Sequence, residues 1–256
     1  MRKYLVTIGF TLFFLVTAPV CTVLGTLLWL VSMPFDKNQA LLHALVCRWC
    51  HYLYLRAWPG WRVRVEGREL LPKGPAVFVA NHQSAMDIVA AMGLFHPFKF
   101  VSKSSLFKVP MVGWLMSMMR YVAVERGHVH AMERMLEECR GWLRRGVAVL
   151  IFPEGTYAPV RHPLPFKRGA FRLAIEEQVP VVPVVLEGTT DILEGDGPRM
   201  GAWATVRVRV LPPLPPESLG TDEVALAARV RALYFEALGL APLQTGSGQE
   251  RTQECA

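Results

Sequence analysis

The first part of the chain is a long apolar segment that predicts a membrane anchor. No charged residue occurs from Tyr4 to Phe35. As a single helix this segment would be roughly 48 Å long, whereas the hydrocarbon core of a bilayer is about 30 Å thick. Pro19 and Gly25 interrupt the segment, so a kinked helix, a re-entrant hairpin and a span with an interfacial tail all agree with the pattern.

Basic residues flank this segment on both sides. Arg2 and Lys3 precede it, and the basic residues that follow it are Lys37, Arg48, Arg56, Arg62 and Arg64. Because Lys and Arg favour the cytoplasmic side of a membrane, both flanks are expected there, which favours a monotopic or re-entrant anchor. Residues 38–58 place their leucines largely on one helical face and predict a second helix, lying at the interface or packed on the following domain. Residues 1–58 are therefore expected to attach the protein to the cytoplasmic face of a membrane.

After Pro59 and Gly60 the pattern changes to short apolar runs that alternate with amphipathic stretches. The predicted strands are Trp61–Glu66, Ala76–Ala80, Phe98–Val101, Tyr121–Val124, Ala148–Phe152, Val181–Leu186 and Val206–Leu211. The predicted helices are Ile88–Leu94, Met111–Met119, His130–Arg145, Gly169–Glu177 and Thr221–Leu238. This alternation predicts an α/β fold, with a mostly parallel sheet flanked by helices, in a single domain over residues 59–243. The polar tail, residues 244–256, is expected to be disordered.

Composition narrows the class of protein. Hydrophobic residues make up 52% of the 256 residues and charged residues only 19%, which suits a membrane-attached enzyme. The formal net charge of +7 should attract the chain to anionic phospholipid or to phosphorylated substrates. No stripe of interleaved aromatic and basic residues is present, so nucleic acid is not an expected partner.

The cysteines do not form a disulfide framework in a chain of this length, which points to a reducing, cytosol-facing location. The segment from Cys47 to His51 matches the pattern of c-type haem attachment. An amphipathic helix in which cysteines are ordinary apolar filling explains the same residues, and we favour it.

The string NHQSAMD, which directly follows a predicted buried strand, supplies a candidate general base. If the whole string were helical, His82 and Asp87 would be rotated by about 140° around the axis and could not meet. We therefore expect His82 on the turn before the helix, with Ser84 capping that helix and Asp87 reaching back to the imidazole. Such a carboxylate fixes the tautomer of the histidine and stabilises the imidazolium. A capping turn without catalysis would also explain the string.

The string FPEGT ends another predicted buried strand, where an open α/β sheet usually places its ligand contacts. A carboxylate such as Glu154 could bind substrate hydroxyls there or hold an arginine, although a simple turn with Gly155 at positive φ fits as well. The basic residues that could bind a phosphate or headgroup, or could simply be solvated surface, are Lys103, Arg126, Arg161, Lys167 and Arg168.

Taken in order, these strings resemble the motifs of the glycerolipid acyltransferases, the family that includes 1-acylglycerol-3-phosphate acyltransferase. The resemblance covers roughly residues 63–214. Besides NHQSAMD and FPEGT, it rests on KSSLF with the later VER, on FKRGA, and on VPVVPV at residues 179–184. It implies transfer of a fatty acyl group from acyl-CoA or acyl-carrier protein to a glycerolipid hydroxyl, with no metal or other cofactor.

The resemblance also implies roles for individual residues. His82 would deprotonate the acceptor hydroxyl, and Asp87 would orient the histidine. The residues it assigns to substrate binding are Ser84, Lys103, Arg126, Glu154, Gly155, Thr156 and Lys167. The expected partners are membrane phospholipid, a lysolipid acceptor and the acyl donor.

Two departures from the family pattern concern the acceptor. Tyr157 and Ala158 stand where the family usually has arginine and serine, and Ser105 stands where it often has glutamate. One expected phosphate contact is thus missing, unless Arg161 replaces it. The acceptor is expected to be 1-acylglycerol-3-phosphate, and another lysophospholipid or an amino-acid lipid is the alternative. A membrane lipid-binding protein without catalysis is the alternative from another class.

Overall fold

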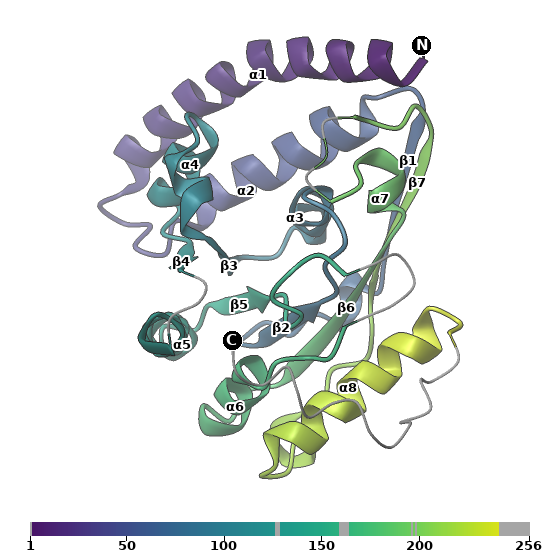
Figure 1. Ribbon diagram of the computed structural model, residues 1–256. Helices are drawn as coiled ribbons and strands as arrows, with labels where there is room; N and C mark the ends of the chain where they lie inside the picture. Colours follow the sequence, from purple (N-terminus) through teal and green to yellow (C-terminus); the bar gives the residue numbers. More distant parts are fainter. Residues whose placement is uncertain (1, 126–128, 159–163, 196, 198, 241–256) are drawn as a thin grey trace.

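A computed structural model describes residues 2–125, 129–158, 164–195, 197 and 199–240. Its centre is a seven-stranded sheet in the order β1-β7-β6-β2-β5-β3-β4 (Figure 1). The strands are β1 (Trp61–Glu66), β2 (Val77–Ala80), β3 (Phe98–Lys103), β4 (Val122–Val124), β5 (Ala148–Ile151), β6 (Val181–Glu187) and β7 (Ala204–Val210). Only the pairing of β6 with β7 is antiparallel, so the sheet is mostly parallel, as the alternating pattern predicts.

Helices cover both faces of the sheet (Figure 1). The α-helices are α1 (Arg2–Ser32), α2 (Ala40–Arg48), α3 (Met86–Ala91), α4 (Val112–Met118), α5 (Val129–Arg144), α6 (Gly169–Glu176), α7 (Thr189–Ile192) and α8 (Glu223–Ala237). The π- and 3₁₀-helical segments are η1 (Trp49–Arg56), η2 (Arg68–Leu70), η3 (Met92–Leu94), η4 (Ser104–Lys108) and η5 (Pro216–Ser218). Of these, η1 is a π-helix that continues α2 directly.

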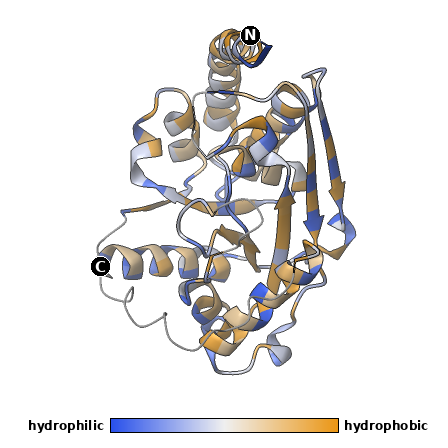
Figure 2. Ribbon diagram, turned by 45° about the vertical axis from the view of Figure 1, so that its right-hand side comes forward, coloured by the Kyte–Doolittle hydropathy of each residue, from blue (hydrophilic) through white to orange (hydrophobic). Residues whose placement is uncertain are grey.

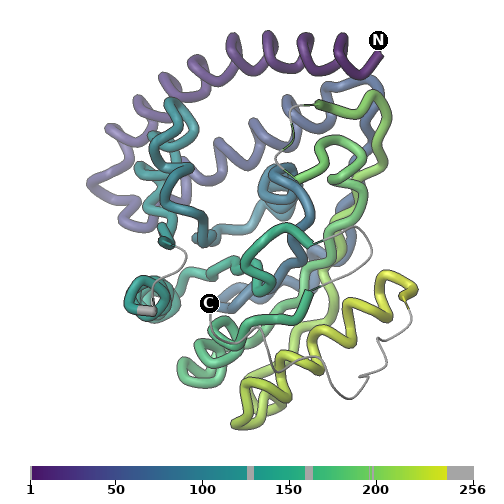
Figure 3. Tube along the Cα trace, in the orientation of Figure 1, coloured from purple at the N-terminus to yellow at the C-terminus, as the bar shows by residue number. Residues whose placement is uncertain are grey.

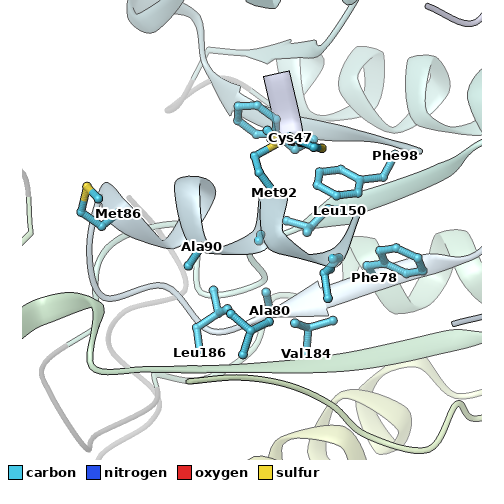
Figure 4. Packing of buried hydrophobic residues seen from close by; sticks show 14 of the residues in the cluster. Cys47, Phe78, Ala80, Met86, Ala90, Met92, Phe98, Leu150, Val184 and Leu186 are labelled. Carbon is cyan, nitrogen blue, oxygen red and sulfur yellow. Dashed lines mark hydrogen bonds between the residues drawn. The ribbon is translucent and has the colours of Figure 1, made fainter. Parts of the chain in front are cut away.

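Alternation along the central strand explains why two cores form. Phe78 and Ala80 of β2 point into a core shared with α2, α3 and α4 (Figure 4). Val77 and Val79 point the opposite way, into a core shared with α5, α6 and α8. All four residues of β2 are buried, which is the property of a strand with helices on both faces.

The anchor segment forms one uninterrupted helix, α1, with Pro19 inside it. It is therefore not folded back as a re-entrant hairpin, one of the options that the sequence pattern left open. One side of α1 packs along α2 and α4, where Ala18, Cys21 and Gly25 are buried (Figure 3). The opposite side is apolar and exposed, and α1 is largely orange at the top of Figure 2. Exposed apolar residues on that side are Leu5, Ile8, Leu12, Leu15, Val16, Val23, Leu27 and Leu30.

The predicted elements agree closely with those of the structure. Every predicted strand is present, and β1 has the predicted bounds, Trp61–Glu66. The other strands and helices of the domain differ from prediction by a few residues at their ends. The second helix, expected over residues 38–58, is α2 with η1, and it packs on the domain through contacts with α3 and β1. The predicted disordered tail lies outside the described residues.

Candidate active site

Three neighbouring parallel strands deliver the candidate catalytic groups to one edge of the sheet. The order β6-β2-β5 places the carboxyl ends of these strands side by side. His82 follows β2, Phe152 and Glu154 follow β5, and Thr189 follows β6. Asn81 extends the pairing of β2 with β6 through its side chain, which accepts from the Leu186 N–H and donates to the Leu186 carbonyl. These two hydrogen bonds therefore fix the backbone between the end of β2 and His82.

His82 and Asp87 form the pair that the sequence predicts. The distance from His82 Nδ1 to Asp87 Oδ2 is 2.9 Å, and the carboxylate is fully buried. The same oxygen accepts the backbone N–H groups of Gln83 and Ser84, at 2.6 and 2.8 Å, and Oδ1 accepts the Thr189 hydroxyl at 2.5 Å. Since an ionised carboxylate only accepts, Nδ1 of His82 carries the proton and Nε2 is left to take one from a substrate.

Aromatic rings and a second carboxyl hold the histidine in place. The imidazole stacks on Phe152 with ring centroids 4.0 Å apart, and Tyr157 lies at 4.5 Å. Glu154 Oε2 accepts the backbone N–H of His82 at 3.1 Å. The orientation of the ring is thus determined by Asp87 of α3 and by groups from the segment after β5.

The carboxyl of Glu154 is buried, and its Oε1 has no hydrogen-bond partner among the described residues. The pKa of Glu154 is raised from 4.5 to about 8, mainly by burial and to a smaller extent by the nearby Asp87, whereas the His82 N–H and Arg231 act in the opposite direction. Glu154 is therefore largely protonated at neutral pH. Its place is behind the histidine backbone, so it supports His82 rather than facing a substrate.

A cavity of about 550 Å³ opens beside His82. Its walls are mostly apolar and come from α1, α2, α3, α4 and β3, including Phe14, Ala18, Ile88 and Phe100. Its lining also includes two cationic residues, Lys103 and Lys167. The cavity therefore combines a base, two positive charges and room for an apolar chain.

The residues predicted to bind substrate divide into three groups. Lys103, Gly155 and Lys167 line the cavity. Gly155 has φ of 71°, and a Cβ there would lie 3.0 Å from Lys167 Cε, so the glycine allows that lysine to approach closely. Arg126 lies outside the described residues, as does Arg161.

Ser84, Glu154 and Thr156 do not line this cavity. Ser84 is fully buried, donates to the Leu193 carbonyl at 2.5 Å and accepts the Met86 N–H. It therefore stabilises the turn into α3, although the helix boundary puts Ala85 at the N-cap. The expected contact of these three residues with substrate has no support in this geometry.

Two contributors to the site were not expected from the sequence. Thr189 bonds to Asp87 although 102 residues separate them, and Phe152 stacks on His82 from a different strand. A threonine directly after a buried parallel strand is the signal that could have identified Thr189, because it shares the position of His82 relative to its own strand.

The segment with the haem-attachment pattern fills the core. Cys47 is fully buried, and its Sγ lies 3.5 Å from Met92 Sδ, near the centre of Figure 4. Among the described residues, no group of three or more His, Cys, Asp or Glu side chains has the arrangement of a metal site.

Comparisons with known proteins agree with this geometry. A 1-acyl-sn-glycerol-3-phosphate acyltransferase of Pseudomonas aeruginosa is 30% identical to this chain, and the match covers 91% of each protein. The alpha form from Homo sapiens is 36% identical over 87% of this chain and 75% of its own. A chloroplastic 1-acyl-sn-glycerol-3-phosphate acyltransferase of Arabidopsis thaliana is 34% identical over 79% of this chain, which spans only 58% of that relative.

The fold has a solved counterpart. The crystal structure of the 1-acyl-sn-glycerophosphate acyltransferase PlsC from Thermotoga maritima superposes with a TM-score of 0.74 and 28% sequence identity, covering 95% of this chain and all of that one. The sequence model of the family described as Acyltransferase matches residues 62–187, which include His82, Asp87 and Glu154. By motif, fold and sequence, the chain belongs to the acyltransferase family.

Proposed function

We propose that this protein transfers a fatty acyl group from an acyl thioester to the free hydroxyl of 1-acylglycerol-3-phosphate, producing phosphatidic acid for phospholipid synthesis. The observation that carries the proposal is the buried His82–Asp87 pair, with Nδ1 and Oδ2 2.9 Å apart, beside a mostly apolar cavity that Lys103 and Lys167 also line. The relatives named above, which are 1-acyl-sn-glycerol-3-phosphate acyltransferases, support the choice of acceptor.

The chemistry follows from the free imidazole nitrogen. Nε2 of His82 takes the proton of the acceptor hydroxyl as its oxygen attacks the thioester carbonyl, and Asp87 stabilises the resulting imidazolium. The tetrahedral intermediate collapses with cleavage of the carbon–sulfur bond, and the imidazolium returns the proton to the leaving thiolate. The proposed reaction uses acyl-CoA or acyl-carrier protein as co-substrate and no cofactor.

Cavity walls suggest how the substrates are held. The apolar part accommodates acyl chain, while Lys103 and Lys167 are placed to bind the phosphate of the acceptor near His82. Both the acceptor and the product are membrane lipids, and the exposed apolar side of α1 would keep the cavity at the cytoplasmic surface of a membrane.

The test is release of free thiol by the full chain in detergent, given acyl-CoA and lysophosphatidic acid. His82→Ala should lower kcat by about 10² to 10⁴ because it removes the base. His130→Ala is the matched control, since His130 is exposed on α5. Equal turnover by the two variants would refute the role of His82.

The acceptor headgroup needs its own experiment, because Tyr157 occupies the position of the family arginine and its ring lies 4.5 Å from the His82 ring. A panel of lysolipids, with products identified by mass spectrometry, separates the two candidate acceptor classes. Lysophosphatidic acid should be the most active acceptor. If it is inert and another lysophospholipid or an amino-acid lipid is acylated, the acceptor assignment is wrong while acyl transfer stands. Tight lysolipid binding without thiol release would instead indicate a non-catalytic lipid-binding protein.

A further inference from the structure

A second cavity, of about 740 Å³, lies at the end of α1, next to α4. Its walls come from the turn between α1 and α2, from the end of α4, and from Arg145 after α5 (Figure 1). It shares no lining residue with the cavity beside His82. The proposed acyl transfer therefore does not account for it.

Three cationic side chains converge on this second cavity. Lys37, Arg120 and Arg145 line it, and none of them forms an ion pair with another residue in the part of the chain that the structure describes. The Arg120 and Arg145 guanidinium groups lie 5.4 and 4.9 Å from the centroid of the buried Trp142 ring, which limits their movement. Two of the three charges are thus held in place by an aromatic ring rather than by an ion pair.

A fourth cation lies beneath them. Lys99 is only 1% exposed, and its Nζ donates to the backbone carbonyls of Asn38 and Met119 at 2.7 and 2.6 Å. Its ammonium lies 4.6 Å from the Trp142 ring. The pKa of Lys99 is lowered from 10.5 to about 8, mainly by burial and to a smaller extent by the charge of Arg120, while Asp36 opposes the shift. The cationic groups are close enough to repel one another.

The nearby carboxylates leave most of this charge uncompensated. Asp36 accepts the backbone N–H groups of Ala40 and Leu41 at 3.0 and 2.8 Å, and so is occupied at the start of α2. Burial raises the pKa of Glu138 and the charge of Arg120 opposes that shift, but Glu138 forms no ion pair with Arg120 among the described residues. An anion with several oxygens would supply the missing negative charge.

The cavity also contains a buried polar group without a partner. Gln39 is 6% exposed, it adopts φ of 58°, and its Oε1 accepts no hydrogen bond from the described residues. A buried amide without a partner destabilises the folded protein, and occupants that offer a hydroxyl or accept from the amide relieve that cost. Gln39 therefore marks this cavity as a binding site rather than a gap between surface cations.

Apolar groups complete the other wall and indicate the kind of occupant. Trp29 and Met33 of the α1 end line the cavity, and the exposed apolar side of α1 leads up to them. Tryptophan beside lysine and arginine is the arrangement found where proteins meet lipid headgroups. We propose that this second cavity binds the phosphate-bearing headgroup of one anionic phospholipid, with Lys37, Arg120 and Arg145 contacting the phosphate and Trp29 and Met33 contacting its glycerol and acyl portion.

The experiment is native mass spectrometry of the full chain in detergent, titrated with phosphatidylglycerol. The wild type should retain one lipid molecule saturably, and Lys37→Gln/Arg120→Gln/Arg145→Gln should weaken retention roughly 30-fold or more, because charge-assisted contacts are lost. The matched control is Lys73→Gln/Arg64→Gln/Arg134→Gln, which removes the same charges from exposed positions outside both cavities. It should bind like the wild type.

Further arms distinguish the occupants. Phosphatidylcholine should bind at least tenfold more weakly than phosphatidylglycerol, and millimolar inorganic phosphate should not displace the lipid. Equal lipid retention by the two triple variants, or displacement by millimolar inorganic phosphate, would overturn the proposal. So would intact lipid retention by the cavity triple variant with a raised KM for the acyl donor, which would make this a donor-docking site.

If the cavity triple variant does not fold, Arg120→Gln and Arg145→Gln are measured singly against Arg134→Gln. None of these binding measurements depends on turnover, so a failure of the proposed acyl transfer would leave them unaffected.

Discussion

At the scale of single residues, Asp87 does more than orient a histidine. One of its oxygens collects three N–H groups, from His82, Gln83 and Ser84, and the other accepts the Thr189 hydroxyl. An asparagine can imitate this pattern, because its oxygen can accept the N–H groups while its amide donates to a rotated Thr189 hydroxyl. Replacing Asp87 with asparagine therefore removes the charge of this side chain while keeping its hydrogen-bond geometry.

Asp87→Asn should retain the fold and lower kcat by about 10² to 10⁴, since the imidazolium loses its charged partner. Thiol release measures kcat, and the thermal midpoint reports the fold. Asp191→Asn, at an exposed position on α7, is the control and should leave both unchanged. A kcat within twofold of wild type for Asp87→Asn would show that the charge of Asp87 does not contribute to catalysis.

Glu154 predicts a pH dependence of stability. Its pKa is raised from 4.5 to about 8 in the folded protein, so between these values the folded state holds a proton that the unfolded state has lost. The contribution of Glu154 to the free energy of unfolding therefore falls as pH rises from about 5 to 8, by up to about 1 kcal/mol per unit, and levels off above 8.

Glu154→Gln should flatten this slope, because glutamine does not titrate and its carbonyl can still accept the His82 N–H. Denaturant unfolding of both proteins at pH 5, 6, 7 and 8 makes the comparison. Parallel stability profiles for wild type and variant would mean that Glu154 titrates near its ordinary pKa.

At the scale of helices and strands, pattern alone predicted most of the fold. Runs such as Val77–Ala80 are apolar at every position because both faces of the strand are covered, and that signal is local. The continuity of α1 through Pro19 was not predictable, because it depends on the contacts of α1 with α2 and α4. The direction of the Glu154 side chain also depends on a remote partner, the backbone of His82. Sequence spacing located the site residues but not which of them face the cavity.

At Gly25, α1 lies close to side chains of α4 and α2. A Cβ there would lie 2.9 Å from Leu115 Cδ2 and 3.1 Å from Leu42 Cδ1. These atoms are the ends of flexible side chains, so Gly25→Ala should be tolerated, whereas Gly25→Leu should destabilise the helix contact by about 1–3 kcal/mol.

Maleimide labelling of Cys21, which is 3% exposed on the buried side of α1, reports this contact. Gly25→Leu should accelerate labelling of Cys21, with peptide mapping to separate it from the other cysteines. Val23→Leu, at a position 59% exposed on the same helix, should not accelerate it. Equal labelling rates would show that the space around Gly25 does not determine the docking of α1.

At the scale of the whole molecule, most of the exposed large apolar side chains lie on α1. Exposed leucines and valines follow one side of α1, while the opposite side closes the cavity beside His82. This arrangement suits a helix that lies along a membrane surface, with the domain beneath it.

Leu12→Glu/Val23→Glu should reduce sedimentation of the protein with anionic liposomes at least tenfold while leaving the fold intact, because both positions are exposed. The control, Val224→Glu/Ala228→Glu on α8, adds the same charge to exposed apolar positions on another helix and should sediment like the wild type. Unchanged sedimentation of the α1 variant would place the membrane contact elsewhere.

The contact between Met200 and α1 has a consequence for how the protein is made. The Met200 N–H donates to Thr7 Oγ1, a hydrogen bond between residues 193 positions apart. A ribosome therefore releases α1 long before it has translated the segment that fastens this end of the helix. During that interval the exposed apolar side of α1, which α2 and α4 do not cover, is free to bind a membrane. The domain would then complete its folding against a helix that is already attached.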